Sequence, residues 1–405
     1  MASDLRALCR SERLAAIAAV ALIIVAAISR LLSPKSVATF LIAAAALAAL
    51  AAVVGQSVEQ VGERLGPGPT GLLQSALGNL PELLVGVFAL RAGLVQVVQS
   101  ALVGSILANT LLVLGVAVLA GGLRHGAQRF LSAAPRMIGT LLLLSVAALL
   151  VPTLAARLHT PASAHAAGLS GAVAVVLIAV YALNIPFTLR RSAETALDAG
   201  PGASTAAGAG AEGPEPARVA AGPNGPEPAP VAAAPDAPEP LAVAASPAGP
   251  DGRWSLRLAI IMLALGSLGA ALVSDWFVGA LQPATQSLGL SQTFTGLVIV
   301  AIASNAVENV VGIRLAWAAR PDFALATILN SPLQIALLLV PLLVLASHIT
   351  GPTQLTLVFP ALEVCALALA TVVVIVVLAD GEYVWLEGVA LIGLYCIVAA
   401  SFWWG

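Results

Sequence analysis

Two apolar stretches of the chain carry the same set of polar residues at the same spacing. The two copies lie 226 residues apart and consist of Asn79, Glu82 and Ser105, then Asn305, Glu308 and Ser331. A carboxylate inside a membrane-length apolar segment costs about 2.5–3.5 kcal/mol on insertion scales. Two such acids in matched positions predict one shared site for a positively charged substrate.

Every polar group near these glutamates offers oxygen as a ligand. Asn109 follows Ser105 in the first stretch, and Gln334 follows Ser331 in the second. Hard cations such as Ca²⁺ prefer carboxylate and carbonyl oxygen. Two close carboxylates repel each other in a low-dielectric site unless a cation or protons neutralise them. The same pair can therefore hold a metal ion or protons, which predicts cation–proton exchange.

Prolines indicate where the helices that carry the site are interrupted. Pro81 precedes Glu82 and removes a backbone hydrogen bond from its span. In the second half Pro332 supplies the break, one span later. Carbonyl groups that are freed at membrane depth are tolerated where they line a cavity or bind an ion. We therefore expect breaks at both prolines, next to the site.

The composition predicts an all-α polytopic membrane protein. Of the 405 residues, 60% are hydrophobic and 9% are charged, whereas a soluble protein is about 25% charged. A hydrocarbon core about 30 Å thick is crossed by about 20 apolar residues in a helix. Eleven candidate spans lie near 14–32, 37–55, 71–91, 94–120, 131–151, 166–189, 256–278, 291–316, 323–347, 355–379 and 384–403.

Arginine indicates the orientation of these spans. If the N-terminus is cytoplasmic and the sides alternate, only Arg30, Lys35, Arg91 and Arg157 of the basic residues near the spans fall outside. This bias agrees with the positive-inside rule. The sequence thus predicts a protein of a bacterial inner membrane.

One polar segment, residues 192–252, divides the chain. It is rich in Ala, Pro and Gly and has no aromatic residue, so it cannot bury enough apolar area to offset chain entropy. We expect a disordered cytoplasmic linker between two repeats, 37–191 and 253–405, with the tail and first span in 1–36. Five spans per repeat is an odd number, so the second repeat inserts upside down, an arrangement that places transporter sites near the bilayer midplane.

Three further acids lie in or beside the spans. Glu59 follows the second span, Asp275 lies near the end of its span, and Glu363 lies inside the tenth. Each could relay protons or form a mouth of the pathway, and a structural or solvated role fits each equally well.

Catalytic motifs that would indicate other membrane functions are absent from the sequence. It contains neither a Gly-x-x-x-x-Gly-Lys-[Ser/Thr] phosphate loop nor a His-Glu-x-x-His motif. Primary pumping and proteolysis are therefore poor fits. We expect a secondary transporter rather than an enzyme, with no cofactor.

The repeated motifs resemble the calcium/cation antiporter superfamily, in its calcium–proton exchanger branch. Residues 78–83 and 97–115 look like the first α-repeat of that branch, and residues 304–309 and 330–337 are similar to the second. The resemblance covers essentially the whole membrane part. It implies an eleven-helix antiporter made of one N-terminal helix and two inverted five-helix repeats.

The resemblance also implies which residues bind the ion. Ligation falls on Glu82 and Glu308, and the acids that precede each α-repeat in the family match Glu59 and Asp275. The supporting ligands that it implies are Asn79, Asn305, Ser105, Asn109, Ser331 and Gln334. The second repeat departs from the family pattern at Ser304, Asn309, Asn330 and Pro332.

The implied activity is Ca²⁺/H⁺ exchange. Sodium–proton or sodium–calcium exchange is the alternative within the same class. A non-transporting membrane scaffold, whose linker binds a partner, is the alternative from another class. The expected partners are inorganic cations, protons and the lipid bilayer, with no nucleic acid.

Deletion of residues 200–245 tests the role of the linker. Because loop-closure entropy changes slowly with loop length, we expect ion exchange in proteoliposomes to stay largely intact. Complete loss of exchange in a correctly inserted protein would show that the linker does more than connect the repeats.

Overall fold

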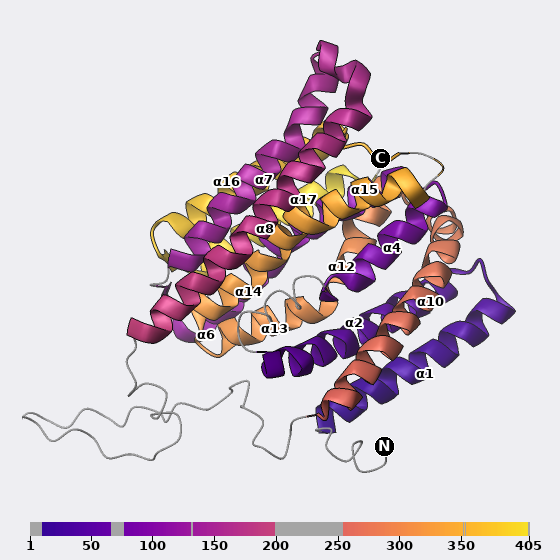
Figure 1. Cartoon of the computed structure of the whole chain (residues 1–405), viewed down its shortest axis with the longest axis horizontal. Coiled ribbons are helices and arrows are strands. Elements are labelled where there is room, and N and C mark those ends of the chain that lie inside the picture. The colour runs from indigo at the N-terminus through magenta and orange to yellow at the C-terminus, as the bar shows by residue number, and fades with distance from the viewer. Residues whose placement is uncertain are drawn as a thin grey trace, which may run out of the picture.

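The computed structural model describes residues 10–65, 77–130, 133–198, 254–350, 352 and 354–403. Within these ranges the regular secondary structure is helical apart from one two-stranded sheet (Figure 1). Eight helices are long and apolar enough to cross a membrane, or nine if the bent pair Gln292–Ser304 and Asn309–Trp317 is one span. The all-helical membrane fold is therefore confirmed, whereas the count of eleven spans stays a prediction.

The expected segments 71–91 and 384–403 account for the two remaining spans. Part of the first lies outside the described residues, and the second corresponds to a helix of 17 residues. The expected linker, 192–252, also lies largely outside the described residues.

The elements of the first half are α1 (Arg10–Leu32), α2 (Val37–Leu65), α4 (Leu80–Arg91), α5 (Val95–Leu107), the π-helical η2 (Ala108–Val113), α6 (Leu114–His125), β1 (Gln128–Arg129), α7 (Ala133–Arg157), η3 (Pro161–His165) and α8 (Ala166–Asp198). Those of the second half are α10 (Leu256–Leu288), α11 (Gln292–Phe294), the π-helical η4 (Thr295–Val300), α12 (Ala301–Ser304), α13 (Ala306–Trp317), α14 (Pro321–Gln334), the π-helical η5 (Ile335–Leu339), α15 (Val340–Thr350), α16 (Ala361–Ala379), β2 (Glu382–Tyr383) and α17 (Trp385–Ser401).

The two halves have matching elements and make reciprocal contacts. The α5–η2–α6 helix corresponds to α14–η5–α15, and each contains a π-helical segment at the equivalent place. In the first half α6 packs on α13 and α17 of the second half. In return, α15 packs on α4 and α8 of the first half. Exchange of equivalent partners is the pattern that a two-fold rotation between two copies produces.

A separate group of helices flanks this bundle. Helix α2 packs along α10, its equivalent in the second half, and α1 packs against α2 (Figure 1). Arg30 of α1 also forms an ion pair with Asp275 of α10, at 3.1 Å. Helix α10 contacts α4, and α2 contacts α12, so these outer helices touch the bundle in both halves.

Glycine allows the two halves to touch through their backbones. A Cβ atom on Gly104 of α5 would lie 2.1 Å from the carbonyl oxygen of Leu297 in η4, and one on Gly296 would lie 2.6 Å from that of Val97. Small residues are what allow membrane helices to approach so closely. The α5–η4 crossing is thereby held at backbone contact.

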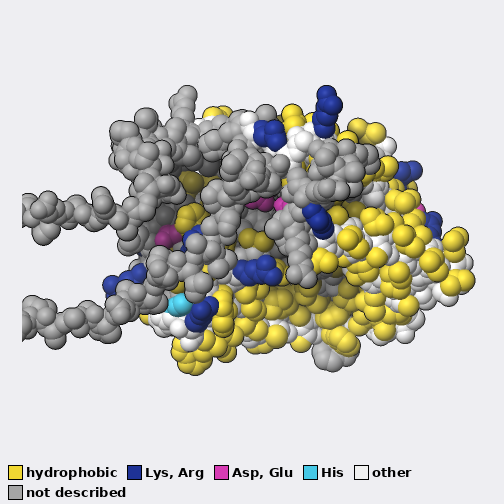
Figure 2. Space-filling model, turned by 90° about the horizontal axis from the view of Figure 1, so that it is seen from below, with side chains coloured by type: hydrophobic (Ala, Val, Ile, Leu, Met, Phe, Trp, Pro, Cys, Tyr) yellow, Lys and Arg dark blue, Asp and Glu magenta, His cyan; other side chains and the backbone are white. Residues whose placement is uncertain are grey.

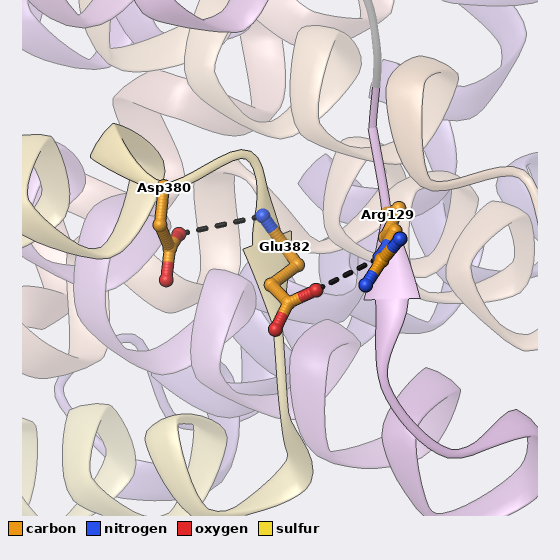
Figure 3. A network of polar contacts seen from close by, with 3 residues as sticks. All are labelled: Arg129, Asp380 and Glu382. Atoms are coloured by element: carbon orange, nitrogen blue, oxygen red, sulfur yellow. Dashed lines mark hydrogen bonds and ion pairs between the residues drawn. The ribbon is translucent and has the colours of Figure 1, made fainter.

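The loops of the two halves meet in the small sheet, in which β1 pairs antiparallel with β2. Arg129 and Glu382 form an exposed ion pair at 2.9 Å, and the backbone N–H of Glu382 donates to Asp380 (Figure 3). Beneath it, the buried hydroxyl of Tyr383 donates to Gln128 at 2.7 Å. Burial, with a smaller contribution from Asp322, raises the pKa of Tyr383 to about 12, so this hydroxyl remains a donor at neutral pH.

The outer surface is rich in exposed aliphatic side chains. Leu265, Leu268 and Val376 are each at least 60% exposed, and hydrophobic side chains cover much of the visible face in Figure 2. Such surface is favourable in contact with lipid tails and not with water.

Substitution of Gly104 by alanine tests the backbone contact. Because the new methyl group has to displace backbone atoms, we expect a loss of about 1–3 kcal/mol in stability or more, seen as a lower thermal unfolding midpoint in detergent. Gly279→Ala in α10 is the matched control, since no atom lies within 4 Å of its added Cβ. Equal midpoints for both variants would contradict the contact.

Candidate functional site

Two short helices begin at equivalent asparagines, and each carries one of the predicted acids in its first turn. Helix α4 starts after Asn79 (φ −88°, ψ 16°) and α13 starts after Asn305 (φ −98°, ψ 8°). Both asparagines adopt the sparsely populated bridge conformation that is common at active sites. Glu82 and Glu308 each occupy the third position of their helix, where the positive end of the helix dipole favours negative charge.

The helix breaks lie at these asparagines rather than at the prolines. Pro81 occupies the second position of α4, where its missing N–H would have no helical partner in any case. The prediction that Pro332 breaks the second half is wrong. Helix α14 continues through Pro332 to Gln334, and its hydrogen-bond pattern then widens into the π-helical η5 instead of stopping. The interruption is at Asn305, which joins helical segments bent by 63°.

A buried network of hydrogen bonds connects the two predicted sets of ligands. The Asn305 amide donates to Ser105 Oγ at 3.1 Å and to the Ala301 carbonyl at 3.0 Å. The hydroxyl of Ser331 donates to Asn305 Oδ1 at 3.4 Å, and the Asn109 amide donates to Ser331 Oγ at 3.4 Å. All four polar side chains are at most 5% exposed. The network therefore starts at Asn109 in the first half, passes through Ser331 and Asn305 of the second half, and returns to Ser105 in the first.

Asn79 forms a second link between the halves. Its amide donates to Gln334 Oε1 at 3.1 Å. Its own Oδ1 is buried and makes no hydrogen bond within the described part of the chain. An acceptor oxygen in that position is suited to a cation, because a buried polar atom without a partner costs about 1–3 kcal/mol.

A small cavity lies between Glu82 and this network. Its volume is about 30 Å³, which is enough for a water-sized occupant. Its polar lining residues are Glu82, Ser105 and Ser304, and the remainder are apolar residues such as Val300 and Leu343. Glu82 Oε2 is itself buried. A carboxylate, two hydroxyls and the neighbouring amide oxygens offer the all-oxygen set that hard cations prefer.

The other predicted acids are distributed differently. The side chain of Glu308 lies outside the described residues. Glu59 and Asp275 are exposed on α2 and α10, and Asp275 pairs with Arg30. Across the described ranges, no three His, Cys, Asp or Glu side chains come together as a metal cluster. Among the side chains that the structure describes, Glu82 is the carboxylate that lines the cavity beside the network.

Two polar residues have positions that the spacing did not indicate. Ser304, which departs from the family pattern and offers a hydroxyl oxygen next to Asn305, lines the cavity and accepts a hydrogen bond from the Asn305 amide at 3.2 Å. Gln99, which shares α5 with Ser105, turns away and donates to the carbonyls of Thr356 and Val358. The 226-residue offset matches Ser304 to Gly78, which has no side chain, so the signal that could have identified Ser304 is its place next to Asn305.

Comparison with known proteins agrees with this architecture. The sequence model of the family described as "Sodium/calcium exchanger protein" matches residues 35–190 and 258–404. The Ca(2+)/H(+) antiporter of Synechocystis sp. is 34% identical over 367 residues, 90% of each chain. That of Aphanothece halophytica is 32% identical over 371 residues, again 90% of each.

A solved structure extends the likeness to three dimensions. The structure of the Ca2+/H+ antiporter protein YfkE is 25% identical in sequence and superposes with a TM-score of 0.72, covering 96% of this chain and 99% of that one. The helices, the duplicated motifs and these matches lead to one assignment. The chain is an integral membrane protein that belongs to the sodium/calcium exchanger family, within the calcium/cation antiporter superfamily and its calcium–proton exchanger branch.

Proposed function

We propose that this protein exchanges Ca²⁺ for protons across a membrane as a secondary transporter. The observation that carries the proposal is the hydrogen-bond network of Asn109, Ser331, Asn305 and Ser105, which joins the two halves beside the buried Glu82. The relatives from Synechocystis and Aphanothece are Ca(2+)/H(+) antiporters by name, which supports the same activity here.

The proposed ion site combines Glu82 and Glu308 with the neutral oxygens around them. The neutral ligands are Asn79, Asn305, Ser105, Asn109, Ser331 and Gln334. Two ionised glutamates balance the charge of one divalent cation, and protons restore neutrality after the cation leaves. Because cation and protons neutralise the same carboxylates, they occupy the site alternately, and that competition couples their movements in opposite directions.

The proposed transport movement follows from the duplicated construction. The repeats 37–191 and 253–405 carry the two parts of the site, so a relative displacement of the repeats opens it to one side at a time. In this arrangement the N-terminus (1–36) and the 192–252 linker are cytoplasmic, and the membrane is the bacterial inner membrane. Glu59 and Asp275 are proposed to lie along the route that protons take.

Purified protein in liposomes with an imposed pH gradient tests this function. We expect added Ca²⁺ to dissipate the gradient, and we expect Glu82→Gln and Glu308→Gln each to reduce this response to background. The amide keeps the shape of the side chain but removes both its charge and its proton. Na⁺, K⁺ and Mn²⁺ added separately identify the selected cation.

Glu382→Gln is the matched control, because this glutamate forms the exposed ion pair with Arg129 in the small sheet (Figure 3). This variant should leave the response unchanged. Normal exchange in both the Glu82 and Glu308 variants would refute the proposed site. A response to Na⁺ with none to Ca²⁺ would replace the proposed activity with sodium–proton exchange.

A further inference from the structure

A second buried carboxyl group lies outside the site described above. Glu363, in the first turn of α16, is 0% exposed. The hydroxyl of Ser100 on α5 donates to its Oε1 at 2.6 Å. Its Oε2 is buried and has no hydrogen-bond partner among the residues that the structure describes. The group therefore has one unused oxygen at which a proton can bind.

A large cavity lies beside the segment that leads into α16. It has a volume of about 670 Å³ and is lined by segments that meet beside α5, including Gln96, Gln99, Arg157, His159 and Pro360. Gln96, Arg157 and His159 are exposed, whereas Gln99 is 8% exposed. We call this cavity the vestibule. Gln99 and residues 358–360 form what we call its inner wall. Ser100 directly follows Gln99, and Glu363 lies three residues after Pro360, so both partners are within one helical turn of a residue of this wall.

Hydrogen bonds hold the inner wall of the vestibule in place. Gln99 donates to the carbonyls of Thr356 and Val358, at 2.8 and 3.2 Å. The hydroxyl of Thr153 on α7 donates to the Leu357 carbonyl and accepts from the Phe359 N–H, at 3.0 Å each. These bonds fix the segment that enters α16, and they hold Glu363 against α5.

The elements packed on α16 place few charges near Glu363. These elements are α7, α5, η2 and β2. Neither α5 nor η2 contains a titratable residue. Helix α7 brings Arg157 at the vestibule end, followed by His159, and Arg136 at the other end. At that far end α16 is followed by Asp380, and β2 carries Glu382 and Tyr383.

The surroundings of Glu363 contain features that favour the neutral carboxyl group and features that favour the ionised one. Burial disfavours the ionised form. The first-turn position of the helix and the Ser100 hydroxyl stabilise the ionised form. A group that carries protons needs both states to be accessible.

We infer that Glu363 is a proton-binding residue of the exchange cycle, filled from the vestibule and separate from the cation site. This inference rests on the proposed Ca²⁺/H⁺ exchange. When a hydronium ion reaches the inner wall, one O–H bond forms at the Glu363 carboxylate, one O–H bond of hydronium breaks, and a water molecule remains. Ser100 connects this event to α5, which five residues later, about 7.5 Å along the helix axis, carries Ser105 of the central network.

The experiment measures proton-coupled and proton-independent Ca²⁺ movement separately in the variant Glu363→Gln. Two fluxes are measured in proteoliposomes: Ca²⁺ uptake driven by a pH gradient, and exchange of labelled for unlabelled Ca²⁺ at equal pH on both sides. The second flux requires no net proton transfer. A positioned proton-transfer group typically contributes about 10²–10⁴-fold. We therefore expect the proton-driven flux to fall about a hundredfold and labelled Ca²⁺ exchange to be retained. The pH profile of the proton-driven flux should flatten.

Two further variants make the result decisive. Ser100→Ala keeps the carboxyl group but removes its hydrogen bond, and it should displace the pH profile while retaining labelled Ca²⁺ exchange. Glu387→Gln is the control, because Glu387 also lies in a first helical turn but is only partly buried and accepts a hydrogen bond from the Val384 N–H. The fluxes of this variant should match those of the unaltered protein.

Equal loss of both fluxes in Glu363→Gln and Ser100→Ala would show that the Glu363–Ser100 pair has a structural role. Unchanged fluxes in both variants would show that the pair has no role in exchange. Either result overturns the inference. If the unaltered protein couples Ca²⁺ to no proton movement, the proposed function itself fails and the inference falls with it. Loss of proton-driven flux alone supports both.

Discussion

Hydrogen bonding of the Asn305 side chain is the interaction on which the arrangement of the site depends. Its amide donates to the carbonyl of Ala301, the first residue of α12, and to Ser105 in the other half, while its Oδ1 accepts from Ser331. In an apolar interior an unsatisfied polar group costs about 1–3 kcal/mol. One side chain therefore compensates for the interrupted helix and sets the distance between the halves.

The close contact of α5 with η4 makes this network possible. Gly104 and Gly296 bring the two backbones together, and the next residue on α5 is Ser105, which meets Asn305. A larger side chain at Gly104 would move Ser105 away from its partner. The apolar packing and the polar chemistry of the site are thus set by adjacent residues of one helix.

Much of the fold and part of the site could be predicted from the sequence. The apolar segments indicated a helical membrane protein, and the repeated Asn, Glu and Ser identified residues that lie together across the halves. Spacing could not locate the second helix break, because a proline in a helix stops it only if the following residues cannot adjust. At Pro332 the chain passes into η5 instead. Spacing also could not predict the orientation of the Gln99 side chain, because its hydrogen-bond partners are carbonyls more than 250 residues away in the sequence.

The reciprocal packing of the halves has an evolutionary consequence. Ser105 and Asn109 find their partners in the second half, and Ser331 and Asn305 find theirs in the first. Likewise α6 and α15 are each covered by helices of the opposite half. A protein of half this length would bury the same side chains without those partners. An ancestor of that length would therefore have needed a second copy of itself, inserted in the opposite sense, before duplication joined the two in one chain.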